Sequence, residues 1–354
     1  MERIAIDAMG GDHAPEAPVA GALQAVHARP TMSVALVGDA AQIERLLGED
    51  CNHPRIRVVP ASEVIHTAEA PVQAVRKKPD SSMVQTIRQV LDGQADAVIS
   101  AGNTGALMAA GLFILGRMPG IDRPALSALL PVFRGWGMMM LDVGANLDPK
   151  PQHLHQYGLM GSLYCQQVFG IDHPRVALLN VGEEESKGPP LVKDAYQLLH
   201  ADPRIHFVGN VEGRELLQGK ADVVVTDGFA GNIALKLTEG VARDVLGELK
   251  AMFYKNWRTK WAALSIRNEL KGLQDRMDYQ EYGAAPLLGL QQMVFKCHGA
   301  SHAKAFRQAA FVAAKYIEKG SQDRMRERIL EGDGNDPTGS GAGAWDIRSR
   351  QSAD

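Results

Sequence analysis

The feature that most constrains the fold is an alternation of short apolar runs with longer amphipathic stretches. The apolar runs predict strands and the amphipathic stretches predict helices. The predicted strands cover residues 3–7, 33–37, 55–59, 96–100, 125–131, 138–142, 176–180, 205–208, 223–226 and 293–297. The predicted helices cover 15–27, 42–47, 82–91 and 154–169, with others ending near 117 and 200, a long one starting near 231 and a last one over 302–318. This order is typical of a mostly parallel α/β sheet with helices on both faces.

Composition is that of a soluble globular protein. The 354 residues, 45% of them hydrophobic, suffice for a sizeable core, and we expect one α/β domain over residues 1–331. Residues 332–354 are rich in Gly, Ser and Asp and are expected to be disordered. A net charge of −3 gives no basis for nucleic-acid binding. Three cysteines at unrelated spacings, with no signal-peptide core and no apolar run long enough to span a bilayer, predict a cytoplasmic protein.

Residues 222–236, DVVVTDGFAGNIALK, predict a buried strand, a glycine-bearing turn and the start of a helix. The first N–H groups of a helix are unpaired and its dipole is positive there, so such a turn attracts anions. Gly228 and Gly231 would let a ligand approach the backbone. The alternative is an ordinary turn that needs glycine, with Asp227 ordering it.

Polar, glycine-bearing loops follow several of the predicted strands. They are AMGGDH (8–13), SAGNTGA (100–106), DVGANLD (142–148), NVGEEESKG (180–188) and TDGFAGN (226–232). Loops at the carboxyl ends of parallel strands line one crevice, where ligands bind, so we expect one polar site. None of these loops has the spacing of a dinucleotide or nucleoside-triphosphate motif, and no pair of residues has zinc-ligand spacing. We therefore expect neither a cofactor nor a metal.

Six motifs, in order, resemble those of the bacterial phosphate acyltransferases of phospholipid synthesis: AIDAMGGDHAP, SAGNTGALMA, LDVGANLDPKP, LLNVGEEESKG, VVVTDGFAGNIALK and YGAAPLLG. The resemblance covers roughly residues 1–318. It implies a three-layer α/β/α sandwich like that of the isocitrate and isopropylmalate dehydrogenases, usually a homodimer. It also implies transfer of a long-chain fatty acyl group from acyl carrier protein to inorganic phosphate. The acyl phosphate would then pass to a membrane glycerol-3-phosphate acyltransferase.

The resemblance further implies site residues. Lys187, in EEESKG, and Asn232, in DGFAGN, are the implied catalytic pair. The expected phosphate and substrate contacts are Gly10, Gly11, Asp12, His13, Asn103, Thr104, Gly105, Asn146, Asp227, Gly228, Gly231 and His298. Asp12, His13 and His298 have a purely structural role as their alternative. The segment CHGASH (297–302) departs from the family's more apolar approach to a His-Gly-Ser step, which leaves Ser301 without an assigned role.

The expected reaction needs positioning and charge stabilisation more than proton transfer. Phosphate is largely anionic near pH 7, and a thiol, with a pKa of about 8.5, is a good leaving group. Lys187 would hold phosphate against the thioester carbonyl, and the Asn232 amide would stabilise the charge that grows on the carbonyl oxygen. One glutamate of 183–185 could orient the lysine.

Residues 250–276 differ from the rest of the chain, with seven basic and two acidic residues and a net charge of +5. Apolar residues recur here at helical spacing, and we expect an exposed amphipathic hairpin over 250–280. Its expected contacts with anionic lipid or with the acidic carrier protein are Phe253, Trp257, Arg258, Lys260, Trp261 and Leu264. Packing on the protein body or on a dimer mate is the alternative. Delivery of product to a membrane enzyme favours peripheral association with the inner face of the membrane.

Other classes stay open at the level of sequence. One is a short-chain phosphotransacetylase acting on acetyl-CoA, and another is a dehydrogenase on the same fold. A third is a membrane scaffold without catalytic activity that binds carrier protein.

Overall fold

A computed structural model describes residues 1–133, 135, 137–267, 270–272 and 284–331. Its strands are β1 (Glu2–Asp7), β2 (Met32–Gly38), β3 (Ile56–Pro60), β4 (Ala97–Ser100), β5 (Ala125–Leu130), β6 (Met138–Leu141), β7 (Arg175–Asn180), β8 (His206–Glu212), β9 (Val223–Val225), β10 (Ala285–Leu288) and β11 (Met293–Lys296). Its helices are α1 (Glu16–Ala28), α2 (Ala40–Leu47), α3 (Pro71–Lys77), α4 (Ser82–Leu91), α5 (Thr104–Ala110), α6 (Pro151–Tyr164), α7 (Pro190–Ala201), α8 (Gly228–Tyr254), α9 (Trp257–Ser265), α11 (Ala303–Glu318) and α12 (Ser321–Leu330). The tail predicted over 332–354 and part of the predicted hairpin lie outside the described residues.

The described strands form one sheet in the order β3-β2-β1-β4-β11-β10-β5-β6-β9-β7-β8. The five strands from β3 to β11 are parallel to one another, and so are the four from β6 to β8. Between them, β10 is antiparallel to both neighbours, and β5 and β6 form the predicted antiparallel hairpin. The two parallel groups therefore run in opposite directions. The predicted fold class, α/β with a mostly parallel sheet, is confirmed.

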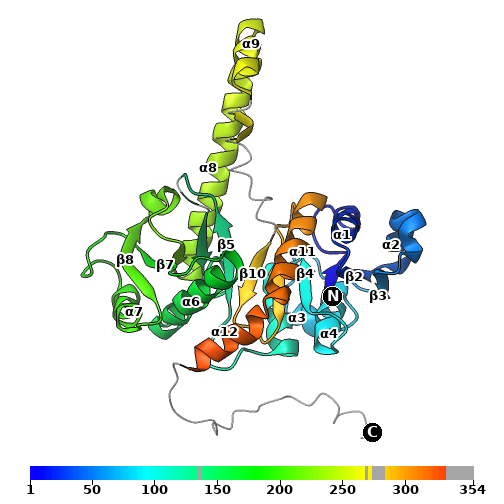
Figure 1. The fold of residues 1–354 in the computed structure, drawn as a ribbon, viewed down its shortest axis with the longest axis horizontal. Helices are drawn as coiled ribbons and strands as arrows, with labels where there is room; N and C mark the ends of the chain where they lie inside the picture. Colours follow the sequence, from blue (N-terminus) through cyan, green and yellow to red (C-terminus); the bar gives the residue numbers. More distant parts are fainter. Residues whose placement is uncertain (134, 136, 268–269, 273–283, 332–354) are drawn as a thin grey trace, which may run out of the picture.

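Helices cover both faces of the sheet, which gives three layers (Figure 1). In β1, Ile4 and Ile6 pack into one core with α1, α6, α7 and α11, whereas Ala5 packs into the other core with α4 and α5. In β9, Val223 and Val225 face the first core and Val224 the second. Because neither face of these strands meets water at their centres, residues 4–6 of β1 and all of β9 are apolar at successive rather than alternate positions.

Elements β10 and α12 were not predicted. β10 is four residues long and contains Pro286, which is rare in inner strands, so its signal was weak. It pairs with β5 through Leu287 and Leu288, and the hydroxyl of Ser127 donates to the carbonyl oxygen of Pro286. The prediction that 302–318 is the last helix is wrong, because α12 follows. Only Met325 and Ile329 give α12 an apolar stripe, and they pack it against α6 and α11.

Helix α8 leaves the body of the molecule and carries α9 at its far end (Figure 1). Of its 27 residues only Gly228 and Gly231 are buried. The helix ends at Tyr254, and the side chain of Asn256 caps α9 by accepting a hydrogen bond from the N–H of Thr259 at 3.1 Å. No helix among the described residues is both long and apolar enough to cross a bilayer.

Candidate active site

The opposed strand directions divide the polar loops into two groups. The first loop cluster, residues 8–13, 100–106 and 297–302, follows β1, β4 and β11. The second loop cluster, residues 142–150, 180–188 and 226–232, follows β6, β7 and β9. The prediction that the loops share one edge of the sheet assumed that all strands run one way. The structure corrects it, because the carboxyl ends of the two groups point to opposite edges.

The predicted catalytic pair belongs to the second loop cluster. Lys187 lies in the loop after β7, and Asn232 lies in the first turns of α8, directly after β9. Strands β7 and β9 are parallel neighbours, with Leu178 paired to Val225. The two side chains are therefore carried by segments that follow adjacent strands at the same end of the sheet, the loop after β7 and the first turns of α8.

The carboxamide of Asn232 lies against the loop after β6. Its Nδ2 donates to the carbonyl oxygen of Val143 at 3.1 Å. The next residue, Gly144, has a φ of +138°, and a Cβ there would lie 2.6 Å from the Asn232 Nδ2. A glycine at position 144 thus leaves room for the amide. One Nδ2 hydrogen is used in this contact, and the amide has a second one to donate.

The N–H groups of the first turn of α8 all donate hydrogen bonds within the protein. The Asp227 carboxylate accepts from the N–H groups of Phe229 and Ala230 at 2.9 and 2.8 Å. The N–H of Gly228 donates to the carbonyl oxygen of Asn146, and that of Gly231 to the carbonyl oxygen of Asp227. These four donors are therefore paired, and the expectation that they bind an anion is wrong. Asp227 orders the turn, as the alternative interpretation had it.

Gly228 and Gly231 serve close packing between two chain segments. A Cβ on Gly228 would lie 2.6 Å from the Asn146 carbonyl oxygen, and one on Gly231 would lie 1.9 Å from that of Asp142. The space beside both glycines is already filled by the loop after β6. Their predicted role, room for a ligand near the backbone, is corrected to room for this loop.

Asp142 is the organising residue that the sequence analysis missed. Its buried carboxylate accepts hydrogen bonds from the N–H groups of Leu126, Gly144, Ala145 and Asn146. Burial raises the pKa of Asp142, and these donors oppose the rise. Asn146, predicted as a substrate contact, uses its Nδ2 to bind the Asp142 carboxylate and the carbonyl oxygen of Pro124. Its donor capacity thus fixes the loop.

The loop that carries Lys187 is clamped at its base by Asn180, a second residue that was missed. Asn180 Nδ2 donates to the carbonyl oxygen of Lys187 at 3.1 Å, and its Oδ1 accepts from the N–H of Val181. The lysine itself is exposed, and within the described residues its ammonium forms no ion pair. A positive charge that no carboxylate of the described residues neutralises suits Lys187 to an anionic ligand.

Two of the three glutamates beside Lys187 have other partners. Glu183 forms an ion pair with Lys220 at 2.8 Å, and Glu185 accepts from the side chain of Gln197. Glu184 is the one that shares space with the lysine, because a Cβ on Gly182 would meet both the Glu184 Oε2 and the Lys187 Cγ. If a glutamate orients the lysine, the geometry favours Glu184.

The first loop cluster surrounds a buried lysine that was not predicted as a site residue. The Lys296 ammonium donates to the carbonyl oxygens of Ala101 and Cys297. Burial lowers the pKa of Lys296 to about 8, although Cys297, Asp7 and Asp12 oppose the shift. Burial raises the pKa of Asp7, which accepts from the Ser100 hydroxyl at 2.7 Å. Lys296 was missed because it is the last residue of an apolar strand and lies just before the segment 297–302 that was singled out.

Several predicted residues are brought together in this first cluster. The N–H of Asp12 donates to the carbonyl oxygen of Gly299, and the rings of His13 and His302 stack with centroids 4.2 Å apart. His298 Nδ1 accepts from the N–H of Ala300. Further predicted residues in this cluster are Gly10, Gly11, Asn103, Thr104 and Gly105.

Asn103 has a structural task. Its Oδ1 accepts from the N–H of Ala106 and caps α5, while its Nδ2 donates to the carbonyl oxygens of Thr67 and Glu69. Gly105 stands close to Pro71, since a Cβ on this glycine would lie 2.6 Å from the proline Cγ. Asn103 therefore holds α5 to the segment before α3, and Gly105 packs against the first residue of α3.

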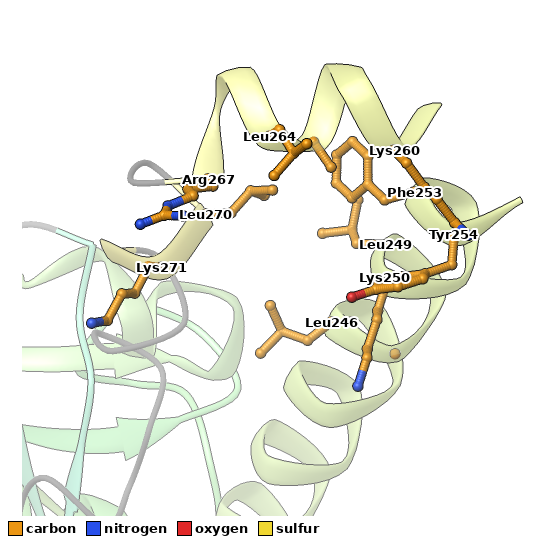
Figure 2. A pocket seen from close by; sticks show the side chains of 12 residues that line it. Leu246, Leu249, Lys250, Phe253, Tyr254, Lys260, Leu264, Arg267, Leu270 and Lys271 are labelled. Atoms are coloured by element: carbon orange, nitrogen blue, oxygen red, sulfur yellow. The ribbon is translucent and has the colours of Figure 1, made fainter. Parts of the chain in front are cut away.

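The predicted apolar stripe over 253–264 is divided between two faces of the hairpin. Phe253 and Leu264 line a cavity between α8 and α9, as does Lys260 (Figure 2). Trp257 and Trp261 do not line it and are 67% and 68% exposed. A single helix would have kept all four apolar residues on one face. The cap at Asn256 starts a new helix and breaks that register.

Solved structures show the class of fold. A phosphotransacetylase from Streptococcus pyogenes matches with a TM-score of 0.61 at 18% identity, covering 90% of this chain and 94% of that one. A branched-chain phosphotransacylase from Enterococcus faecalis matches with a TM-score of 0.57 at 16% identity, covering 90% and 99%. The chain thus has the fold of the phosphotransacylases.

The particular family follows from the sequence: the chain belongs to the fatty acid synthesis protein family, whose model matches residues 2–324. The phosphate acyltransferase of Oceanobacillus iheyensis is 52% identical over 316 residues, 89% of this chain and 94% of that protein. That of Bacillus pumilus is 51% identical over 317 residues, 90% and 94% of the two chains. The expected family is confirmed, and with it an acyltransferase of fatty acid and phospholipid synthesis.

Proposed function

We propose that the chain transfers a long-chain acyl group from the thioester of acyl carrier protein to inorganic phosphate. A phosphate oxygen attacks the thioester carbon, the carbon–sulfur bond breaks, and the products are an acyl phosphate and the free carrier thiol. The observation that carries the proposal is the placement of Lys187 and Asn232 on the segments that follow two adjacent parallel strands, the loop after β7 and the first turns of α8 after β9. The phosphate acyltransferases that are about half identical to this chain support the same reaction.

Each member of the pair has a separate role. The unpaired ammonium of Lys187 holds phosphate by charge, and the loop that carries it is fixed at its base by Asn180. The second Nδ2 hydrogen of Asn232 donates to the thioester oxygen, where negative charge grows, while Val143 holds the first. Neither role requires the residue to exchange a proton, because the attacking phosphate is already an anion and the thiolate is a good leaving group.

The proposal is tested with purified chain, palmitoyl carrier protein and phosphate. We expect phosphate-dependent loss of the thioester, lowered by about 10²–10³ in Lys187→Ala. Lys193→Ala is the matched control, because Lys193 is also exposed but lies on α7. Equal rates for wild type and Lys187→Ala would refute the role of the lysine, and thioester loss that ignores phosphate would refute the reaction.

The same assay separates the rival activities. A short-chain phosphotransacetylase would prefer acetyl-CoA to palmitoyl carrier protein. A dehydrogenase would change the absorbance of a nicotinamide, and a scaffold would bind carrier protein without consuming the thioester.

The outer face of the hairpin is the proposed membrane contact. Trp257 and Trp261 are one helical turn apart and exposed, and the guanidinium of Arg258 lies 5.4 Å from the ring of Trp257. Exposed aromatic rings beside cations suit the interface of an anionic membrane. Such contact would make a cytoplasmic protein peripheral to the inner face and bring acyl phosphate to a glycerol-3-phosphate acyltransferase. Deleting residues 255–276 should reduce liposome flotation more than turnover, and unchanged flotation would contradict this.

We also propose that the protein forms a homodimer. Residues four apart along α8 form an exposed apolar row that ends below the hairpin. They are Phe229, Ile233, Leu237, Val241 and Val245, each between 51% and 64% exposed. Packing this row on the same row of a second copy would remove it from water. Leu237→Glu with Val241→Glu should turn a dimer into a monomer in light scattering.

A further inference from the structure

A surface pocket of about 440 Å³ lies where α6 begins, and this volume is within the range of sites for small ligands. Two segments line it, one before β5 and one that runs from the loop after β6 into α6. The lining residues are Arg117, Asp122, Arg123, Lys150, Gln152 and His153. None of them was predicted as a site residue, and the roles proposed for Lys187 and Asn232 do not use them.

Positive charge prevails in this basic pocket. It has three cationic side chains, those of Arg117, Arg123 and Lys150, against one carboxylate, that of Asp122. Within the part of the chain that the structure describes, none of the three cations forms an ion pair. The Asp122 carboxylate instead accepts from the side chain of Gln156 at 3.3 Å. A net excess of cations that lack carboxylate partners suits an anionic group of a ligand.

His153 adds a hydrogen-bond donor to the pocket. The residue is 6% exposed, and its Nδ1 accepts from the N–H of Lys150 at 3.0 Å. Burial lowers the pKa of His153, and Asp122 opposes the shift. Arg123 and Lys150 add to the lowering, so the ring is neutral near pH 7 and carries its proton on Nε2. No described residue accepts from this Nε2, which leaves it to a ligand in the pocket.

The chain around the pocket is held in place, while its binding groups are free. Arg117 Nη1 donates to the carbonyl oxygen of Asp122 at 2.7 Å, and the N–H of Asp122 donates to the Gln156 side chain at 3.0 Å. By contrast, the guanidinium of Arg123 and the ammonium of Lys150 donate to no described residue. These two cations can therefore bind a ligand without giving up a contact within the described chain.

The pocket adjoins the predicted catalytic pair. Asn232 donates to the carbonyl oxygen of Val143 in the loop after β6. Three residues further along this loop, Asn146 donates to the carbonyl oxygen of Pro124. Three residues span at most about 11 Å, and Arg123 directly precedes Pro124. The pocket and the Asn232 amide thus lie at the two ends of one short piece of chain, and a ligand with two separated functional groups can reach both.

The proposed substrate has two such groups. A carrier protein holds its thioester at the end of a pantetheine arm, and a phosphodiester attaches this arm to the protein. About thirteen bonds separate the phosphorus from the sulfur, so the arm spans about 15 Å at about 3.5 Å for every three bonds of an extended chain. A thioester beside Asn232 therefore brings the phosphodiester within reach of Arg123 and Lys150.

We propose that the basic pocket binds the phosphodiester of the carrier's pantetheine arm and thereby positions the thioester at Asn232. The inference rests on the proposed function for the identity of its ligand. Inorganic phosphate is another source of the same chemistry, but the phosphate that attacks must touch the thioester carbon. A group in the pocket is kept from that carbon by the loop over residues 143–150, which favours the arm.

Two small substrates test the assignment: the lauroyl thioesters of phosphopantetheine and of pantetheine, with saturating inorganic phosphate. They differ only in the phosphate group and carry no protein surface. The wild type should have at least about tenfold higher kcat/KM for the phosphorylated thioester, since a charge-assisted hydrogen bond is worth about that factor. Arg123→Gln and Lys150→Gln should each lower this ratio, whereas Arg45→Gln, at an exposed position on α2, should keep it. A wild-type ratio near one, or the same ratio in all variants, would overturn the proposal.

Other ligands of the pocket give other patterns. If it holds inorganic phosphate, Arg123→Gln raises the KM for phosphate equally with both thioesters and leaves their ratio unchanged. If it holds acidic side chains of the carrier, the variant slows palmitoyl carrier protein and neither small thioester. Either result would overturn the assignment to the arm.

Calorimetry separates failure of this inference from failure of the proposed function. Phosphopantetheine and pantetheine are titrated into the full-length protein with no thioester present. Binding of the phosphorylated form that is tighter by at least about tenfold, and is weakened in Arg123→Gln, supports the pocket even if the chain transfers no acyl group. Equal affinities for the two compounds would overturn the inference, while phosphate-dependent loss of palmitoyl carrier protein would still support the proposed function.

Discussion

Asn232 donates from its Nδ2 to the carbonyl oxygen of Val143 over 3.1 Å, and Gly144 leaves the space in which that carboxamide lies. This contact joins the first turns of α8 to the loop after β6. It holds the predicted oxyanion donor from a segment almost ninety positions away, so the precision of the site depends on how the loop after β6 packs against the start of α8.

Gly144→Ala should therefore lower turnover by displacing Asn232. Its Cβ would lie 2.6 Å from the amide nitrogen, and the φ of +138° adds backbone strain. We expect about a tenfold loss or more of kcat, since small misplacements of catalytic groups are costly. Gly170→Ala is the control, because Gly170 also has a positive φ but a Cβ added there would meet no other residue within 4 Å. Equal turnover of the two variants would contradict this reading.

Asn232→Ala removes the donor itself. We expect kcat for palmitoyl carrier protein to fall by about 10²–10³, as for the loss of one oxyanion donor. The melting temperature should change little, because Asn232 is only partly buried and its side chain donates a single hydrogen bond, to Val143, among the described residues. A variant with wild-type kcat would remove Asn232 from the mechanism.

Asp142→Asn tests the residue that organises the loop after β6. An amide in place of the carboxylate turns one acceptor atom into a donor that faces N–H groups, including that of Asn146. Since charge-assisted hydrogen bonds contribute more than neutral ones, we expect a loss of about 2–4 kcal/mol in the free energy of unfolding. Urea unfolding measures it, with the exposed Asp172→Asn as a control near zero. If Asp142→Asn lowers the free energy of unfolding no more than Asp172→Asn does, the Asp142 carboxylate does not hold the loop.

Lys296 predicts a pH dependence of stability. Burial lowers its folded pKa to about 8, below the value of about 10.4 for an unfolded lysine. Between these pH values the unfolded chain binds a proton that the folded chain does not, so the free energy of unfolding rises with pH. Relative to Lys296→Met, the wild type should gain up to about 1.4 kcal/mol per pH unit between pH 8 and pH 10.

Urea unfolding at several pH values measures this slope. The control variant is Lys193→Met, at an exposed position on α7. We expect its free energy of unfolding to differ from that of the wild type by the same amount at every pH. A Lys296→Met variant whose stability parallels that of the wild type across this range would mean that the ammonium is not desolvated.

The sequence by itself determined most of the strands, the helices between them and the family, and it supplied the prediction of the catalytic pair. These follow from local patterns, because the centre of a strand buried on both faces is a short apolar run and each motif loop is contiguous in the sequence. The antiparallel β10 and the helix α12 escaped because a short run with a proline and a stripe of two apolar residues carry little local signal.

Only the tertiary structure decided how these pieces face one another. The two groups of parallel strands run in opposite directions, so the polar loops form two clusters. The first N–H groups of α8 pair with Asp227 and with the loop after β6. The tertiary structure also turned Phe253 and Leu264 inward while leaving Trp257 and Trp261 outside. Strand direction, hydrogen-bond partners and the side of a hairpin depend on residues far apart in the chain, which no local pattern records.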